Sequence, residues 1–475
     1  MVNTTTKSVF YSGLERALVS GIQFTITIVI ARILSPADYG LIAMLSIFYA
    51  FSQAFVDSGL SAALVQKKDC TEIDYNSVYW FNIFISIVLY IVLYFSAPII
   101  ANLFENKLLI LLVRIYSLNL VISSLTMVHR TIMMKRLMFK ELSIVGFLSS
   151  LISGLLAILL VYKGYSYWAL VFQLLSSSVI LGILVVFLCK WKPLFKFSIK
   201  SFKTLFIFGM PILVTAIINS IYNNIYSLII GSKYNANDLG IYNRAYSLSA
   251  FVPINVGDAT ARALFPVYSI IQDNKEKLKK EKLKALHLLM FVVVPINIFI
   301  LFNAKDLITL LLTEKWIEMT PILQILCFSN IWYPMVNLNL NTIKVLGKTN
   351  ILLRMEFVKK SIGLTVLYIT YNYGLIIMVW GQLLYSFVDL LISLIYIQKI
   401  SIISIKDQIK QVYLLIIFSF LSVSVAFLIT KSINGLLLKL VVSGTIVTIL
   451  YSAMEILTRK DIKLLLYKTL KKTIL

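Results

Sequence analysis

The sequence predicts an all-α polytopic membrane protein of about 14 transmembrane helices, with two six-helix lobes around a central cavity and two additional C-terminal helices. Three observations lead to this fold class. The chain of 475 residues is 59% hydrophobic and only 14% charged, whereas roughly 25% of the residues of an ordinary soluble protein are charged. Apolar stretches near the roughly 20 residues needed to cross a bilayer recur along the chain. Short motifs of the first half also return in the second half, which indicates an internal repeat.

Polar and Gly/Pro/Asn-rich junctions divide the chain into fourteen apolar spans. We expect all of them to be helices, because only helices or closed barrels satisfy their backbone groups in lipid and these spans lack the alternation of barrel strands. The first span is not a signal peptide, since its apolar run is too long and no small-residue cleavage site follows it. The spans lie near 10–33, 39–60, 78–103, 108–128, 142–162, 165–188, 205–231, 239–268, 285–312, 318–341, 355–371, 374–398, 412–430 and 434–456.

The formal net charge of +23 indicates orientation in the membrane and does not require a nucleic-acid partner. If the N-terminus is cytoplasmic, 30 of the 44 basic residues lie in the tail and connections on the cytoplasmic side, and seven lie on the opposite side. This asymmetry is the positive-inside pattern, and it predicts that both termini are cytoplasmic. The basic stretch 273–287 could bind nucleic acid or anionic lipid. A solvated cytoplasmic connection, with or without a short interfacial helix, is the simpler interpretation.

The internal repeat has an offset of 200 residues. Asp38–Leu41 corresponds to Asp238–Ile241 at this offset. A second similarity, at a slightly larger offset and with one gap, pairs Gly164 and Gln173 with Gly374 and Gln382. Two copies with an even number of spans run in the same sense, which suits a carrier that exposes one site to either side of the membrane. We therefore expect an N-terminal six-helix lobe over 1–204, a C-terminal six-helix lobe over 205–411, two additional helices over 412–457 and a basic cytoplasmic tail over 458–475.

The most specific motif is the stretch ARILSPADYGLIAM at Ala31–Met44, which is followed by Asp57–Leu60 and Ala63–Asp69. Further motifs lie at Leu239–Tyr246, at Leu264–Pro266, and at Glu314–Trp316 followed by Pro321–Gln324. Together they resemble bacterial polysaccharide-export flippases, the WzxC-like (Wzx) branch of the multidrug/oligosaccharidyl-lipid/polysaccharide exporter superfamily. The resemblance is specific in the first 70 residues and weaker beyond about residue 350. We expect the SPADYG turn to be structural, because such turns end helices and set the corners between them.

The resemblance implies a carrier, not an enzyme, in the bacterial inner membrane. It would move an undecaprenyl-diphosphate-linked oligosaccharide from the cytoplasmic to the periplasmic leaflet, for O-antigen, capsule or exopolysaccharide biosynthesis. Polysaccharide polymerase and other assembly proteins are candidate partners, besides the lipid bilayer itself.

Two rival functions stay open. A multidrug exporter of the same superfamily would favour acidic residues in its cavity. A membrane enzyme of polysaccharide assembly, a polymerase or ligase, would carry a long extracytoplasmic loop with catalytic residues.

Arginines within the spans are the candidate substrate-binding residues. Ionisable side chains are costly in a bilayer and usually face a cavity or a partner. Arginine supplies only nine of the 44 basic residues of the chain, yet it predominates inside the spans. A guanidinium binds phosphate oxygens in a bidentate manner, which suits a diphosphate. The alternative is that each arginine pairs with a carboxylate, as Asp258 and Arg262 are spaced to do, or reaches a headgroup. The candidates for the diphosphate and cavity are Arg16, Arg114, Arg244 and Arg262, with Asn219 and Asn223, whose amides suit either sugar hydroxyls or contacts between helices.

Asp57 and Asp258 are the candidate residues for coupling to H⁺ or Na⁺. The movement of one charge across 100 mV is worth roughly 2.3 kcal/mol, enough to bias a carrier cycle. Asp389 could carry the ion too, but a structural pair or a helix cap is the simpler explanation for it, and the same alternative stays open for Asp57. Cys70, Cys189 and Cys327 are too far apart in the sequence to suggest a metal site or a disulfide, and no cofactor is expected.

Overall fold

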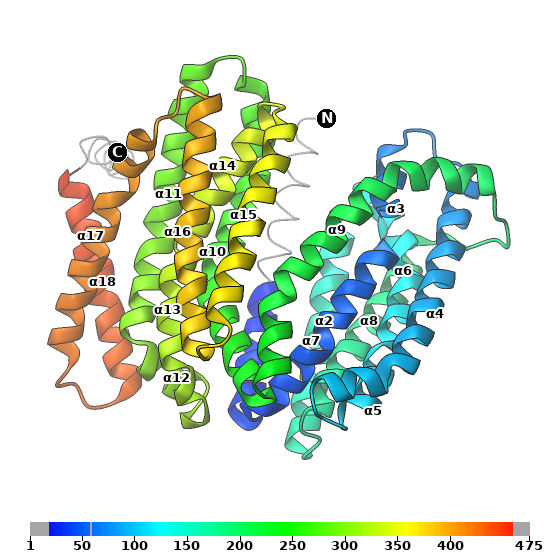
Figure 1. The fold of residues 1–475 in the computed structure, drawn as a ribbon, viewed down its shortest axis with the longest axis horizontal. Coiled ribbons are helices and arrows are strands. Elements are labelled where there is room, and N and C mark those ends of the chain that lie inside the picture. Colours follow the sequence, from blue (N-terminus) through cyan, green and yellow to red (C-terminus); the bar gives the residue numbers. More distant parts are fainter. Residues whose placement is uncertain (1–18, 58, 459–475) are drawn as a thin grey trace, which may run out of the picture. The chain divides into compact units, whose positions relative to one another are not determined.

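The computed structural model describes residues 19–57 and 59–458, and all regular secondary structure within these ranges is helical (Figure 1). Each predicted span coincides with one or more helices, and the predicted all-α fold is confirmed. The helices are Val19–Ile33, α2 (Pro36–Asp57), α3 (Leu60–Gln66), α4 (Glu72–Leu103), α5 (Leu109–Tyr116), α6 (Leu118–Lys135), α7 (Phe139–Tyr162), α8 (Trp168–Cys189), α9 (Ile199–Lys233), α10 (Ala236–Ile271), α11 (Lys275–Phe302), α12 (Ala304–Leu311), η1 (Glu314–Met319), α13 (Thr320–Asn330), α14 (Tyr333–Val345), α15 (Thr349–Thr370), α16 (Leu375–Ile400), α17 (Ile405–Thr430) and α18 (Leu436–Thr458).

Ten helical segments in the described part of the chain are long and apolar enough to cross a membrane. The chain is therefore a multi-pass membrane protein, whereas the count of 14 stays a prediction. Helix α15 falls outside the ten because it carries several charged residues, and α10 because its polar residues lower its hydropathy. Helices α13 and α14 fall outside because each is short. These helices need partners for their polar groups, and such partners are found within the fold.

Five helices begin six to ten residues before the predicted spans, namely α4, α9, α11, α15 and α17. Hydropathy marks only the apolar part of a helix, but an N-cap side chain can start the helix earlier in the polar interface. The Ser198 hydroxyl accepts a hydrogen bond from the Ser201 amide, and the Asn274 side chain accepts one from the Lys277 amide. Thr71 and Ser404 begin their helices with capping boxes.

The basic stretch 273–287 forms the first turns of α11, so the interpretation as a separate connection or short interfacial helix was wrong. Leu278, Lys282 and Leu286 recur every four residues and are buried, whereas Lys280 and Lys284 are exposed. One face of these turns therefore packs into the protein, and this packing extends the helix beyond its apolar part.

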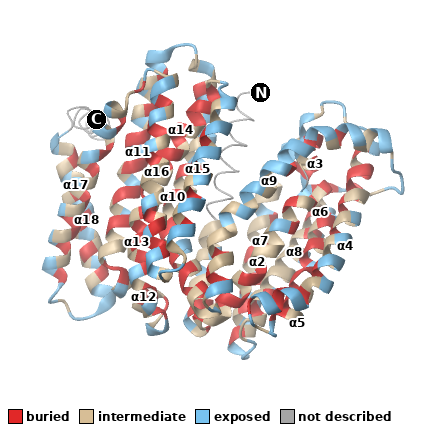
Figure 2. Cartoon of the chain, viewed as in Figure 1, coloured by how far each residue is buried: buried red, intermediate tan, exposed pale blue. Residues whose placement is uncertain are grey.

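The chain forms two compact units, Met1–Asn243 and Arg244–Leu475. Buried side chains line the inner faces of the helices in each unit (Figure 2). The core of the first unit gathers Leu60, Leu64 and Val128, and the core of the second gathers Leu286, Leu394 and Leu415. Helix α9 packs against α2, α3 and α4 and so belongs to the first unit. The division of the sequence repeat at residue 205 stays a prediction.

Three charged pairs tie the two additional helices to the rest of the second unit. Lys279 of α11 contacts Asp407 of α17 at 2.7 Å. His287 of α11 contacts Glu455 of α18 at 2.9 Å, and both side chains are buried. At the other end of α18, the Lys439 ammonium contacts Asp306 of α12 at 2.5 Å. The pairs therefore hold α17 and α18 against α11 and α12 along their length.

The two copies of the repeated motif cross each other through a pair of glycines. A Cβ atom at Gly40 would lie 1.6 Å from the carbonyl oxygen of Ala236, and one at Gly240 would lie 1.8 Å from that of Pro36. Gly40 and Gly240 are 200 residues apart in the sequence, and so are the residues that they contact, Pro36 and Ala236. Only glycine allows the backbones of α2 and of the first turns of α10 to approach so closely.

The residues just before these glycines cap the two helices. Asp38 accepts hydrogen bonds from the Ser35 amide at 2.9 Å and the Ser35 hydroxyl at 2.7 Å. In the second copy, the Asn235 side chain accepts a hydrogen bond from the Asp238 amide at 2.8 Å. These bonds give the motif a structural role, as the sequence led us to expect.

Gly40→Ala and Gly240→Ala are each expected to lower the thermal stability of the detergent-purified chain. Overpacking typically costs about 1–3 kcal/mol, and here the obstruction is backbone that a side-chain rotation cannot relieve. Gly444→Ala in α18 is the control, since its Cβ would meet only Phe299, at 3.9 Å. Equal melting temperatures for Gly40→Ala and Gly444→Ala would refute the close crossing.

Candidate functional site

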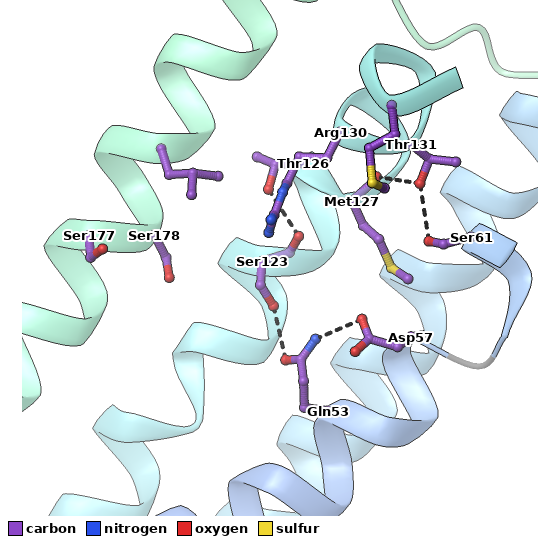
Figure 3. A pocket seen from close by; sticks show the side chains of 12 residues that line it. Gln53, Asp57, Ser61, Ser123, Thr126, Met127, Arg130, Thr131, Ser177 and Ser178 are labelled. Carbon is purple, nitrogen blue, oxygen red and sulfur yellow. Dashed lines mark hydrogen bonds between the residues drawn. The ribbon is translucent and has the colours of Figure 1, made fainter. Parts of the chain in front are cut away.

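A polar pocket of about 350 Å³ lies inside the first unit, among α2, α3, α6 and α8 (Figure 3). Six hydroxyl side chains, one amide, one carboxylate and one guanidinium line it, with three apolar side chains. A pocket of this composition within apolar helices is suited to a ligand rich in hydroxyl or phosphate groups. Its lining residues are Gln53, Asp57, Ser61, Ser123, Thr126, Met127, Arg130, Thr131, Met134, Ser177, Ser178 and Leu181.

Asp57 stands at the C-terminal end of α2, where it is held by a chain of hydrogen bonds. Gln53, one turn earlier, donates to the Asp57 carboxylate at 3.2 Å. The Ser123 hydroxyl of α6 donates to the Gln53 side-chain oxygen at 3.3 Å. Figure 3 shows this chain crossing from α6 to α2. The carboxylate therefore has a fixed position at the edge of the pocket.

Arg130 is the cation of the pocket, and it enters from α6. It is exposed, and in the described part of the chain it forms no hydrogen bond or ion pair. It is near enough to Asp57 for the two charges to interact. A guanidinium with all of its donors available can bind a phosphate group or several sugar hydroxyls.

Arg130 was not among the predicted site residues. It follows the predicted end of a span, where it was assigned to a cytoplasmic connection. Helix α6 continues to Lys135, beyond the predicted end of the span at residue 128. A signal was present in the spacing: Ser123, Met127, Arg130 and Met134 follow one helical face. Because this stripe continues past residue 128, it indicates that the helix extends beyond the predicted span.

The two other arginines of the first unit do not meet in this pocket. Arg16 lies outside the described residues. Arg114 of α5 stacks on the ring of Tyr94 of α4, with its Cζ atom 4.2 Å from the ring centroid. Its Nε also donates to the Tyr94 carbonyl oxygen at 3.4 Å. This geometry favours a packing role for Arg114, and its contact with a diphosphate stays a prediction.

Arg244 and Arg262 share one face of α10 in the second unit. They are 18 residues apart, which is about five helical turns, and Asp258 lies close to the same face. Asp258 accepts hydrogen bonds from the Tyr333 hydroxyl at 2.8 Å and from the Asn337 amide at 2.9 Å, both of α14. Arg262 is exposed, one turn beyond Asp258.

Asparagines of α13 and α14 join these helices to α10. The Asn330 side chain donates to the Ser249 hydroxyl at 2.9 Å, and the Asn341 side chain donates to the Ala261 carbonyl oxygen at 2.7 Å. These amides hold helices together. Asn219 and Asn223 of α9 are exposed, so their predicted contact with the glycan stays a prediction.

Buried charges elsewhere in the second unit have partners. Asp389 of α16 contacts the Lys359 ammonium of α15 at 2.6 Å, which is the structural pair expected for it. Lys282 is fully buried and donates to the Asn339 side-chain oxygen at 2.6 Å. Asn339 in turn donates to the Ser393 hydroxyl at 3.2 Å. Among the described residues, no group of three His, Cys, Asp or Glu side chains is arranged to hold a metal ion.

A family model described as "Polysaccharide biosynthesis protein" matches residues 29–321 of the chain. The chain belongs to this family. The expected membership of the polysaccharide-export group is thereby confirmed, and the motif at Ala31–Met44 lies within the match.

Known relatives of this polysaccharide biosynthesis protein have related names. The chain is 28% identical to the teichuronic acid biosynthesis protein TuaB of Bacillus subtilis (strain 168), over 77% of each chain. It is 24% identical to the lipopolysaccharide biosynthesis protein WzxC of Escherichia coli (strain K12), over 67% of this chain and 65% of that protein. Its fold resembles that of the lipid II flippase MurJ in an inward closed conformation, with a TM-score of 0.77 at 16% identity, over 97% of this chain and 100% of MurJ. The chain therefore shares the fold of MurJ.

Asp258→Ala is expected to lower the thermal stability of the purified protein by about 1–3 kcal/mol, because it leaves the Tyr333 hydroxyl and the Asn337 amide without their acceptor. Asp258→Asn keeps an acceptor oxygen and should lose less. The control is Asp273→Ala, which removes an exposed carboxylate between α10 and α11. If Asp258→Ala and Asp273→Ala unfold at the same temperature, Asp258 does not hold α14 to α10.

Proposed function

We propose that this protein is a flippase that moves an undecaprenyl-diphosphate-linked oligosaccharide from the cytoplasmic to the periplasmic leaflet by alternating access. The glycan would serve as a unit of O-antigen, capsule or exopolysaccharide. The protein would act in the bacterial inner membrane, with both termini in the cytoplasm. Membership of the polysaccharide biosynthesis family and the transporter fold support this function.

The observation that carries the proposal is the polar pocket of the first unit. Arg130 lies beside Asp57 among hydroxyl side chains, and in the described part of the chain it forms no hydrogen bond or ion pair. An ionisable side chain among membrane-spanning helices usually faces a cavity or a partner. The charged diphosphate and the hydroxyl-rich glycan offer the acceptors that Arg130 and the surrounding serines and threonines need. The polyprenyl tail requires no such pocket, since it can stay in the lipid.

In this proposal, Arg130 joins Arg16, Arg114, Arg244 and Arg262 as candidates to bind the diphosphate. Arg130 and Arg262 are exposed, whereas Arg114 is engaged by Tyr94. A carrier that moves an anionic group from one leaflet to the other needs cationic side chains at more than one depth in the membrane. The two arginines of α10 are separated by about 27 Å along the helix axis, at 1.5 Å per residue, and provide such spacing.

The rival functions are less well supported. A multidrug exporter of similar fold would be expected to present acidic residues to cationic drugs, whereas the pocket offers a guanidinium beside its carboxylate. A polymerase or ligase would need a catalytic group on a long extracytoplasmic segment. Loss of drug resistance on deletion of the gene, with normal surface polysaccharide, would favour the exporter.

Arg130→Gln is expected to reduce surface polysaccharide at least tenfold in a deletion strain complemented at an equal protein level. A hydrogen bond to a charged group contributes about 1.5–3 kcal/mol, and 1.4 kcal/mol is a tenfold change in affinity. Arg136→Gln is the matched control, since Arg136 is exposed at the end of the same helix and outside the pocket. Undecaprenyl-linked oligosaccharide should accumulate in the Arg130→Gln strain. Normal polysaccharide in the deletion strain itself would refute the proposed function, whereas equal export by the two variants would refute only the role of Arg130.

Asp57 is the better placed of the two candidate coupling residues, because it faces the pocket while Asp258 is engaged by α14. Transport of a fluorescent undecaprenyl-diphosphate-linked glycan in proteoliposomes should depend on a pH or sodium gradient. Asp57→Asn should abolish that dependence, while Asp69→Asn, a change of an exposed carboxylate before α4, should preserve it. Transport that ignores both gradients would eliminate coupling.

A further inference from the structure

A second cavity lies at the start of α17, far in sequence from the residues of the polar pocket. It is a groove of about 730 Å³ whose lining includes Gln398, Lys406, Ile409, Lys410 and Tyr413, and we call it the basic groove. Gln398 comes from the end of α16, and the other four from the first turns of α17. The basic-residue pattern predicts that this end of α17 is cytoplasmic.

The two lysines of the basic groove have no internal counter-ion. Lys406 and Lys410 are exposed and one turn apart, and neither forms an ion pair with a carboxylate in the described ranges. The nearby Asp407 is occupied, because it contacts Lys279 at 2.7 Å and caps α17 together with Ser404. The groove therefore presents two positive charges that its own helix does not neutralise.

An apolar strip continues from the groove along α17. Ile409, Tyr413, Ile417 and Leu421 recur every four residues, and their exposed fractions are 50%, 43%, 47% and 49%. Side chains at this spacing lie on one face of the helix. An exposed apolar face on a membrane-spanning helix is covered by lipid chains, so the strip runs from the groove into the hydrocarbon region. Figure 2 shows exposed positions along this helix.

We propose that the basic groove binds the phosphate headgroup of an anionic phospholipid whose acyl chain lies along the apolar strip. The charge of the two lysines complements a phosphodiester. The Tyr413 hydroxyl and the Gln398 amide can donate to headgroup oxygens, and basic pockets on the cytoplasmic side of helix bundles are known to suit such headgroups. The occupant is a lipid and not free phosphate, because only a lipid satisfies the strip as well as the lysines. The site lies on the additional helices and does not depend on the proposed function.

The test is lipid binding by the full-length chain, purified and delipidated in detergent and followed by native mass spectrometry. Phosphatidylglycerol should bind Lys406→Gln/Lys410→Gln at least tenfold more weakly than wild type, because the double change removes both positive charges of the groove. Lys280→Gln/Lys284→Gln is the matched control, since it removes two exposed charges one turn apart on α11, outside the groove. Phosphatidylcholine should bind all three proteins alike.

Three outcomes would overturn the proposal. Equal phosphatidylglycerol binding by wild type and Lys406→Gln/Lys410→Gln would show that the groove is not the site. An equal loss in the Lys280→Gln/Lys284→Gln control would assign binding to overall charge. Displacement of phosphatidylglycerol by millimolar inorganic phosphate would make the ligand a free anion. Polysaccharide export by the Lys406→Gln/Lys410→Gln variant reports separately on the flippase function.

Discussion

A polar side chain that is buried in this fold needs a hydrogen-bond or ion-pair partner, because the apolar helices and the lipid around it supply none. The second unit meets this requirement with buried pairs: Lys359 with Asp389, His287 with Glu455, and Lys282 with Asn339. Each pair joins two helices, and two of the three pairs join helices that are not consecutive in the chain, so the need to satisfy a charged group favours particular helix neighbours. Arg130 stands apart, since its guanidinium faces a cavity and lacks a protein acceptor in the described ranges. The same constraint thus explains the packing and points to the site.

Much of the fold could be predicted from the sequence because lipid imposes a simple rule. Apolar length and the positions of polar junctions located the long apolar helices, whereas the short α3 lies between two predicted spans. The motif at Ala31–Met44 indicated the family that the matched model confirms. The errors occurred where a helix continues beyond its apolar part. Asn274 caps α11 ten residues before the predicted span, and α6 runs past residue 128 to Lys135. Capping and partial burial decide these ends, and a hydropathy average does not detect them.

The candidate site could be predicted only in part, for a related reason. Asp57 was identified because a carboxylate in an apolar span is conspicuous. Arg130 was missed because, in a sequence, an arginine at the end of a span looks the same whether it enters a pocket or meets water. The roles of Asp258 and Arg114 depended on Tyr333 and Tyr94, which lie 75 and 20 residues away along the chain. Partners so far apart are brought together by the tertiary fold, and no local pattern reveals them.

The charged pairs that bind α17 and α18 also bear on how such a chain could have evolved. A shorter ancestor that ended before Ile405 would have left Lys279, His287 and Asp306 without Asp407, Glu455 and Lys439. Without α17 and α18 these three side chains would face lipid or water, and an ionisable side chain that faces lipid is costly. The residues at these three positions in a related sequence therefore indicate whether its core is suited to pack against α17 and α18.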